Sequence, residues 1–325
     1  MEVLSGLERL PQSWPNPVIT IGNFDGVHIG HQSLMKTLVA RAAAAGSLSA
    51  VLTFEPHPLR VLAPDHAPRQ IQTLRQKRAS LAALGIDALV VLPFTLELAA
   101  MSARSFVEEI LLRRLRAREI HVGSSFAFGH RREGSFNLLR QLGEEHGFQA
   151  EKIHQVQFRG SRVSSTTVRQ ALITGQVALA RRVLGRPFSL EGDVVHGTAT
   201  GAGIRFPTAN LRTRNEIVPQ NGVYVTTTIL EGRRWKSVTN IGTRPTITGT
   251  ASGEAAIETH ILDLGRDLYG AEIEVEFLLR LRDERRFPSG IELAVQIGRD
   301  VALARRYFLW LARAAPGWLQ ERVQA

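Results

Sequence analysis

The sequence predicts an α/β domain with a parallel sheet, followed by a small antiparallel β-barrel and a terminal helix. Up to about residue 160, short apolar runs alternate with longer amphipathic stretches, which is the rhythm of a parallel sheet covered by helices. Beyond about residue 186, the runs become short and β-rich, and Gly, Pro, Asn and Asp separate them. The tail returns to helical spacing. A chain of 325 residues is long enough for two hydrophobic cores.

The first half is expected to alternate strands and helices. We expect strands at residues 18–21, 50–54, 88–92 and 120–122, and helices at residues 32–45, 73–84, 105–115 and 168–174. Gly46, Gly85 and Gly175 follow three of these helical stretches and are typical helix ends. These elements predict a parallel sheet with helices on its faces.

The second half is expected to form the barrel and a helix that covers it. We expect strands at residues 224–230, 237–241, 256–262 and 273–279, and a helix at residues 291–314. In that helix, one apolar face is expected from Leu293, Ile297, Val301, Leu303 and Phe308. We place the boundary near residues 183–188, which gives domains of residues 1–184 and 185–325.

Composition narrows the class of protein. The absence of cysteine excludes disulfides and thiolate metal sites. No run of eighteen apolar residues and no signal-like N-terminus is present, so we expect a soluble, unprocessed, cytoplasmic protein that does not enter a membrane. The net charge is +10, and residues 1–184 hold 22 Lys and Arg against 14 Asp and Glu. Such a surplus of positive charge is compatible with binding to nucleic acid, to an anionic membrane or to phosphorylated small molecules, and charge alone does not distinguish these partners. The sequence motifs distinguish them.

The first motif joins an expected strand to an expected helix. Residues 19–32 run from apolar Ile-Thr-Ile through Gly-Asn-Phe-Asp-Gly into Val-His-Ile-Gly-His-Gln. Backbone amides at the start of such a helix attract phosphate oxygens. His28 and His31 are three residues apart, so both imidazoles can face one site, and Gly30 leaves space for a nucleotide.

This arrangement suits nucleotidyl transfer. When a phosphate oxygen attacks the α-phosphorus of ATP, charge accumulates on the α-phosphoryl oxygens, and fixed imidazole donors such as His28 and His31 would stabilise it. The alternative interpretation is that the two histidines only satisfy hydrogen bonds of the turn. The whole strand, turn, His-x-Gly-His and helix arrangement favours the catalytic interpretation.

The phrase Gly-Asn-Phe-Asp-Gly-Val-His-Ile-Gly-His at residues 22–31 resembles the adenylyltransferase signature of bacterial bifunctional riboflavin kinase/FAD synthetases. Further blocks of that family are recognisable in order at residues 52–58, 91–95, 126–134 and 163–169. The resemblance implies a Rossmann-like nucleotidyltransferase domain at residues 1–184 that converts FMN and ATP to FAD and pyrophosphate.

The resemblance also implies roles for individual residues. His28 and His31 would be catalytic. The ATP phosphates would be bound by Gly22, Asn23, Phe24, Asp25, Gly30, Ser165, Thr166 and Arg169. The flavin would be bound by Phe54, Pro56, His57, Pro58, Phe126 and Phe128.

Two of these assignments have simpler alternatives. Ser165, Thr166 and Arg169 place hydroxyls, amides and a guanidinium at one helix start, which suits phosphate, although an ordinary N-cap has the same residues. His57 lies between two prolines, and a purely structural turn explains it equally well.

The chain departs from the family pattern on the flavin side. Ser125 and Ala127 stand where the family usually has Asp or Asn and then Arg or another polar residue, and Thr167 stands where Arg is common. These departures motivate an alternative, in which the chain is a riboflavin kinase with a weak or differently specific N-terminal nucleotidyltransferase.

The second motif lies at the start of the expected barrel. No Gly-x-x-x-x-Gly-Lys-Ser/Thr sequence occurs, so a kinase here needs another phosphate cradle. Phe-Pro-Thr-Ala-Asn at residues 206–210 follows a glycine-containing flap and resembles the flavokinase signature. If the backbone is extended, Thr208 and Asn210 share one face and offer hard oxygen donors to Mg²⁺ and, through it, to ATP. A polar turn that ends a strand is the alternative.

Other flavokinase blocks follow in order at residues 221–224, 240–246, 258–263 and 267–270. By this resemblance Glu258 would accept the proton of the riboflavin 5′-hydroxyl as that oxygen attacks the γ-phosphorus. An isolated strand glutamate is more often a solvated face residue. In the flap, Thr200, Ala202 and Arg205 replace the basic, basic and Gly residues that are usual.

Taken as a resemblance over nearly the whole chain, the motifs imply a two-step, Mg²⁺-dependent enzyme that uses ATP, riboflavin and FMN. Neither nucleic acid nor membrane is an expected partner, and a homo-oligomer is compatible with the sequence. A nucleic-acid-binding protein is the third interpretation, because residues 113–118 are rich in arginine, but no known nucleic-acid-binding signature is present.

Overall fold

A computed structural model describes residues 1–325 except 12–13, 154–155, 159, 197–205, 244–254 and 320–325. The chain divides into two compact units, Met1–Ser165 and Thr166–Ala325. The helices α7 (Ser165–Ile173) and α8 (Val177–Leu184) thus fold almost entirely with the second unit. The boundary at 184/185 stays a prediction about where one function ends and the other begins.

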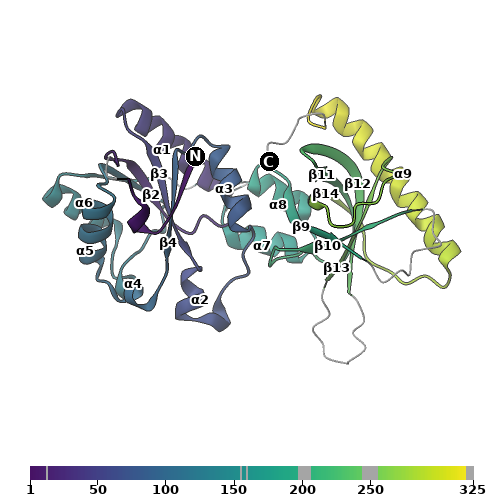
Figure 1. Ribbon diagram of the computed structural model, residues 1–325, viewed down its shortest axis with the longest axis horizontal. Coiled ribbons are helices and arrows are strands. Elements are labelled where there is room, and N and C mark those ends of the chain that lie inside the picture. Colours follow the sequence, from purple (N-terminus) through teal and green to yellow (C-terminus); the bar gives the residue numbers. More distant parts are fainter. Residues whose placement is uncertain (12–13, 154–155, 159, 197–205, 244–254, 320–325) are drawn as a thin grey trace. The chain divides into compact units, whose positions relative to one another are not determined.

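The first unit contains a parallel sheet, of which Figure 1 labels β2, β3 and β4. The sheet has six strands in the order β1-β4-β3-β2-β5-β6. Its strands are β1 (Glu2–Ser5), β2 (Val18–Ile21), β3 (Ser49–Glu55), β4 (Ala88–Pro93), β5 (Glu119–Val122) and β6 (Gln149–Lys152). A short hairpin of β7 (Gln157–Phe158) and β8 (Ser161–Arg162) follows. The predicted parallel sheet is confirmed, and β1 is an edge strand that the sequence did not reveal.

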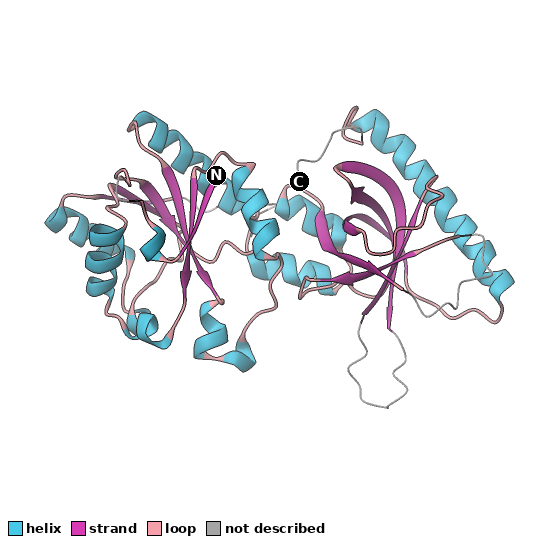
Figure 2. Ribbon diagram, in the orientation of Figure 1, coloured by secondary structure: helices cyan, strands magenta, loops and turns pink. Residues whose placement is uncertain are grey.

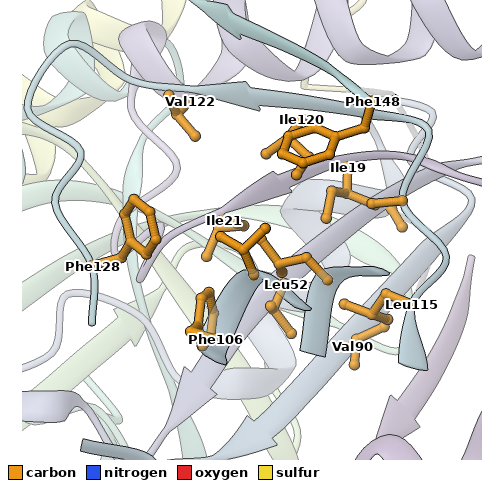
Figure 3. Packing of buried hydrophobic residues seen from close by; sticks show 14 of the residues in the cluster. Ile19, Ile21, Leu52, Val90, Phe106, Leu115, Ile120, Val122, Phe128 and Phe148 are labelled. Atoms are coloured by element: carbon orange, nitrogen blue, oxygen red, sulfur yellow. The ribbon is translucent and has the colours of Figure 1, made fainter. Parts of the chain in front are cut away.

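Alternation along the strands divides the core into two layers. In β2, Val18 belongs to the layer beneath the helices α1 and α3, whereas Ile19 and Ile21 belong to the opposite layer. Figure 3 shows that opposite layer, with Ile19 and Ile21 packed among Leu52, Val90 and Phe106. Helices on both faces bury the whole strand, which is why parallel strands are apolar throughout.

Helices cover this sheet on both faces (Figure 2). They are α1 (Ile29–Ala44), α2 (Pro58–Leu62), α3 (Leu74–Ala82), α4 (Leu96–Ala100), α5 (Ala103–Ser105), a π-helical continuation (Phe106–Arg114) and α6 (Phe136–His146), with 3₁₀ turns at Leu7–Arg9, Pro64–His66 and His130–Arg132. A capping box of Thr73 and Gln76 starts α3. Helix α1 begins three residues earlier than predicted, because the His28 side chain caps it.

The second unit is a closed antiparallel barrel in the order β10-β13-β12-β11-β14-β9. Its strands are β9 (Phe188–Val195), β10 (Ala209–Thr213), β11 (Gly222–Leu230), β12 (Arg233–Thr243), β13 (Ala255–Ile261) and β14 (Glu272–Arg282). The predicted small antiparallel barrel is confirmed. Helix α8 packs against β9 and β14 and buries Val177, Val183 and Leu184.

The terminal helix α9 (Gly290–Ala314) covers one side of the barrel (Figure 1). Ala304, Phe308 and Leu311 of α9 pack on Val223 and Val225 of β11. The prediction that Leu303 belongs to this apolar face is wrong, because Leu303 is 47% exposed. The spacing of the buried residues selects Ala304 instead, one residue and about 100° further round the helix.

Among the described residues, no helix is both long and apolar enough to span a bilayer.

Candidate functional sites in the two units

The first candidate site lies where the connections of the parallel sheet diverge. From β2 the chain continues through α1 to β3 on one side, whereas β5 lies on the other side of β2. Ligands bind at such a switch point, beyond the carboxyl ends of the strands. A cavity of about 790 Å³ is present there, and it is lined by residues that follow β2 and β5.

Many of the predicted residues line this cavity together. They are Gly22, Asn23, Phe24, His31, Phe54, His57, Pro58, Phe126 and Phe128. Within the described part of the chain, His28, Asp25, Gly30, Pro56, Ser165, Thr166 and Arg169 are not among its lining residues. The sequence motif therefore combines residues that face the cavity with residues that lie behind it.

Asp25 is a buried anchor of the loop after β2. Its carboxylate accepts hydrogen bonds from the backbone amides of Ile71 at 3.0 and 3.1 Å and of Gln72 at 3.3 Å. Only 3% of the residue is exposed. Asp25 thus ties the loop to the segment that leads into α3, and it supports the wall of the cavity from behind.

His28 and His31 stack on each other at the start of α1. Their ring centroids are 3.6 Å apart and their planes differ by 15°. Nδ1 of His28 accepts a hydrogen bond from the backbone amide of His31 at 3.3 Å, so His28 is the N-cap. Among the described residues, the buried Nδ1 atom of His31 has no hydrogen-bond partner.

The electrostatic surroundings keep His31 neutral. Burial lowers its pKa well below the usual 6.5, and His28 and Lys77 lower the pKa further. A neutral imidazole donates one hydrogen bond without carrying a charge, which suits charge that develops only in the transition state.

The space that Gly30 leaves is occupied by the ring of His28. A Cβ at Gly30 would lie 3.2 Å from both Cε1 and Nδ1 of that ring. Gly22 has a related role, since a Cβ there would lie 3.0 Å from the Phe24 ring. Gly30 therefore leaves room for the His28 ring and Gly22 for the Phe24 ring, and of these two glycines Gly22 lines the cavity.

The other part of the cavity is aromatic. Phe54 and Phe94 meet edge to face at 5.7 Å, and Phe126 and Phe128 stack at 5.1 Å. Two pairs of rings in one cavity suit a planar aromatic ligand. The prediction missed Phe94, although it lies within the quoted block at residues 91–95.

His57 connects the aromatic part with the loop after β2. Its Nδ1 accepts a hydrogen bond from the Leu59 amide at 3.2 Å and caps α2, and its Nε2 lies 3.1 Å from the side-chain amide of Asn23. His57 is therefore both a structural cap and part of the cavity wall.

Ser165, the last residue of the first unit, contacts the same loop. Its hydroxyl donates to the carbonyl oxygen of Asp25 at 2.8 Å. Thr166 and Arg169 follow on α7 and belong to the second unit.

Two of the positions that depart from the family pattern lie at the cavity, whereas Thr167 is not among its lining residues. Ser125 and Ala127 line it, and Arg162 donates a hydrogen bond to the Ser125 hydroxyl. His130, Arg131 and Arg132 add positive or titratable groups to the lining, and none of the three was predicted. Arg132 lies within the family block at residues 126–134, so the resemblance could have indicated that it belongs to the site.

The second candidate site lies at one end of the barrel. A cavity of about 430 Å³ is lined there by Thr208 and Asn210, and also by His196 and Tyr269, whose rings stack at 3.5 Å. The flap residues Thr200, Ala202 and Arg205 and the block at residues 244–246 lie outside the described residues.

Strand register places Glu258 beside Asn210. Asn210 in β10 pairs with Glu258 in β13, and Glu258 pairs with Asn240 in β12. Directly paired residues share one face of a sheet and have Cβ atoms about 5 Å apart. Glu258 is half-buried between two amide-bearing positions. The prediction did not single out Asn240, because only the barrel register brings it to Glu258.

The donors at this end of the barrel suit Mg²⁺. Thr208 and Asn210 supply a hydroxyl and an amide oxygen at one cavity, and Mg²⁺ prefers few protein oxygens together with water and phosphate. Within the described ranges, no group of three His, Asp or Glu residues could hold a metal ion. A dedicated carboxylate cage is therefore not part of the described structure.

Known proteins share both halves of this chain. The family of FAD synthetases matches residues 10–167, and the family of riboflavin kinases matches residues 184–308. The bifunctional riboflavin kinase/FMN adenylyltransferase of Escherichia coli K12 is 41% identical over 310 residues, which cover 95% of this chain and 98% of that protein. The protein with the same description from Pseudomonas fluorescens is 41% identical over 305 residues, or 94% of this chain and 97% of its own.

Among solved structures, the crystal structure of a macrolide-efflux protein from Streptococcus pneumoniae is similar, with a TM-score of 0.84 and 27% identity. It covers 94% of this chain and 99% of its own. Two family matches that cover most of the chain, and two curated relatives aligned along nearly their whole length, establish the family. The chain belongs to the bifunctional riboflavin kinase/FMN adenylyltransferases.

Proposed function

We propose that this chain carries out its two reactions at the two sites described above. The chain is a riboflavin kinase and an FMN adenylyltransferase. The cavity beyond β2 and β5 would adenylylate FMN, and the end of the barrel with Thr208, Asn210 and Glu258 would phosphorylate riboflavin. The observation that supports the first assignment most is the cavity of about 790 Å³, which combines His31 with two aromatic pairs.

In adenylylation, the flavin ring would lie in the aromatic part of the cavity, near Phe54 and Phe126. The phosphate of FMN would then face the loop after β2, where its oxygen attacks the α-phosphorus of ATP and pyrophosphate leaves. His31 would donate a hydrogen bond to the α-phosphoryl oxygen as its charge grows, and His28 would hold His31 in place by stacking. The assignment of Ser165, Thr166 and Arg169 to the ATP phosphates is part of this proposal, and so is the domain boundary after residue 184.

In phosphorylation, Glu258 would accept the proton of the riboflavin 5′-hydroxyl while that oxygen attacks the γ-phosphorus. Thr208 and Asn210 would hold Mg²⁺, which neutralises charge on the ATP phosphates when bound. Asn210 and Asn240 flank Glu258 and would orient its carboxylate.

A direct assay tests both assignments. Purified protein is incubated with riboflavin, ATP and Mg²⁺, and the flavins are separated by chromatography. We expect FMN to form first and FAD to follow, and we expect chelation of Mg²⁺ to stop both. FMN without FAD would contradict the first assignment, and riboflavin left unchanged would contradict the second.

A second candidate function is favoured by Ser125 and Ala127, which line the first cavity. In it, the nucleotidyltransferase is weak toward FMN or prefers another phosphorylated substrate. The variant Ser125→Asn restores a side chain that is usual in the family. If it raises FAD formation strongly, the second candidate is correct for the present chain.

A further inference from the structure

Lys77 is a buried cation that the motifs do not include. It lies on the inner face of α3, and only 4% of it is exposed. Its Nζ donates a hydrogen bond of 2.8 Å to the backbone carbonyl of Asn23. Among the described residues, no further acceptor of the ammonium group is found. Burial of a lysine ammonium group with a single hydrogen-bond acceptor costs folding free energy, which points to a role of Lys77 at this site.

The carbonyl that Lys77 holds belongs to a strained turn. Asn23 precedes Phe24, whose φ is 45°, and Val27 has a φ of 38°. Both values lie in the left-handed region, which costs non-glycine residues free energy and persists only where the surroundings enforce it. The ring of Phe24 meets His31 edge to face at 5.2 Å. The position of His31 therefore depends on a turn that Lys77 helps to hold.

Lys77 is also a charge beside His31. The titratable groups that face the pair are His28 at the start of α1, Asp25 in the loop and Glu55 at the end of β3. Burial lowers the pKa of Lys77, whereas Asp25 and Glu55 raise it. Lys77 in turn lowers the pKa of His31.

We infer that Lys77 is a positioning residue for FMN adenylylation. Its hydrogen bond to Asn23 fixes the turn that supports His31, and its positive charge lies beside that ring. Lys77 itself does not line the cavity, so it acts through Asn23 and His31. The inference rests on the proposed site of adenylylation.

Three variants separate the hydrogen bond from the charge. Lys77→Met removes both, Lys77→Gln keeps a donor without a charge, and Lys77→Arg keeps both. Lys36 is an exposed lysine on α1, and Lys36→Met is the matched control for loss of one positive charge. Riboflavin phosphorylation by the same chain reports whether each variant is folded and correctly quantified.

We expect Lys77→Met to lower kcat for FAD formation about 100-fold with little change in the KM for FMN, because small displacements of a catalytic group have effects of that size. In the pH profile of FAD formation, the acid limb is the pH range in which the rate falls on acidification. For Lys77→Met this limb should move to higher pH, because loss of a neighbouring positive charge raises the pKa of His31. Lys77→Gln should shift the limb equally with a smaller loss of kcat. Lys77→Arg should restore the limb, and Lys36→Met should match the wild type.

A measurement that does not need activity separates this inference from the proposed site. Titration of the histidines by NMR, with His31 assigned through the variant His31→Gln, gives the pKa of His31 directly. We expect that pKa to be higher in Lys77→Met than in the wild type. An unchanged pKa and acid limb would overturn the inference, as would an equal loss of both activities or a loss that Lys77→Arg does not reverse. If His31→Gln leaves FAD formation intact while the pKa still shifts, the proposed site fails on its own.

Discussion

At the scale of single residues, the first site contains side chains that face the cavity and side chains that support them from behind. His31 and Asn23 line the cavity, whereas Asp25 and His28 form hydrogen bonds to the backbone behind it. Replacement of a facing residue should affect the reaction itself, and replacement of a supporting residue should affect both the reaction and stability. The sequence motif contains both kinds without distinguishing them.

His31→Ala should lower FAD formation about 10²- to 10³-fold and leave riboflavin phosphorylation unchanged, because it removes one donor to the transition state. In the wild type, FAD formation should fall only at pH values well below 6.5. Burial lowers the pKa of His31 well below its usual value of 6.5, and we expect the neutral form to be the active one. Initial rates for each reaction over a range of pH provide the measurement. An acid limb centred near 6.5 would be evidence against neutral His31.

Glu258→Gln should have the opposite selectivity. The amide has the size of the carboxylate but cannot accept the proton of the riboflavin hydroxyl, so phosphorylation should fall about 10²- to 10⁴-fold. Formation of FAD from supplied FMN should remain. Both rates are measured on one preparation by flavin chromatography, and persistent phosphorylation would mean that another group is the base.

At the scale of elements, one buried ion pair connects α9 to the barrel. Asp300 is 3% exposed and accepts hydrogen bonds from Nη2 of Arg282 at 2.7 Å and from Gln296 at 2.8 Å. Arg282 lies at the end of β14. Because hydrogen bonds are directional and apolar contacts are not, the Asp300 carboxylate fixes the position of α9 along its own axis.

Asp300→Ala should lower the free energy of unfolding of the second unit by about 3 kcal/mol, because it leaves the Arg282 guanidinium partly buried and unpaired. The neighbouring exposed residue provides the control Arg299→Ala, which should change stability little. Thermal or denaturant unfolding measures the difference. Equal stabilities of the two variants would show that Asp300 does not hold the helix.

The elements that the sequence predicted well are those with long apolar runs. The strand at 18–21 has its predicted bounds, and most of the other predicted strands are recognisable with small extensions. The strand predicted at 256–262 lies one residue earlier, at Ala255–Ile261. The strand β1 was missed because its sequence Glu-Val-Leu-Ser has only two apolar residues, unlike the mostly apolar β2, and the strand is established by pairing with β4. Helix α6 was missed although Ser135 and Gly147 cap its two ends, so local signals were available.

At the scale of the whole molecule, the two units have separate cores, and α7 and α8 fold with the barrel unit. Amphipathic α8 buries Val177, Ala180, Val183 and Leu184 and packs against β9 and β14. A fragment of residues 166–325 should therefore fold, and one of residues 185–325 should be less stable.

We expect the fragment of residues 166–325 to phosphorylate riboflavin without making FAD, and the shorter fragment to unfold at a lower temperature. The shorter fragment lacks the four side chains that α8 buries, and the apolar surface of β9 and β14 beneath them becomes exposed. The loss is several kcal/mol, at about 1.5–3 kcal/mol for each large buried side chain. Thermal unfolding and riboflavin phosphorylation of both fragments test this. Equal melting temperatures would show that α7 and α8 contribute nothing to the barrel unit.

The sequence by itself determined the two fold classes, the positions of many strands along the chain, and the two motifs from which the family was identified. Local patterns suffice for these, because strand alternation, turn residues and short signatures are read within a few neighbours. Only the tertiary structure decided which motif residues face the cavity, that Asn240 pairs with Glu258, and that Lys77 lies beneath Asn23. The physical reason is that burial and hydrogen bonding between residues far apart in the chain depend on sheet order, register and helix docking, which no local pattern contains.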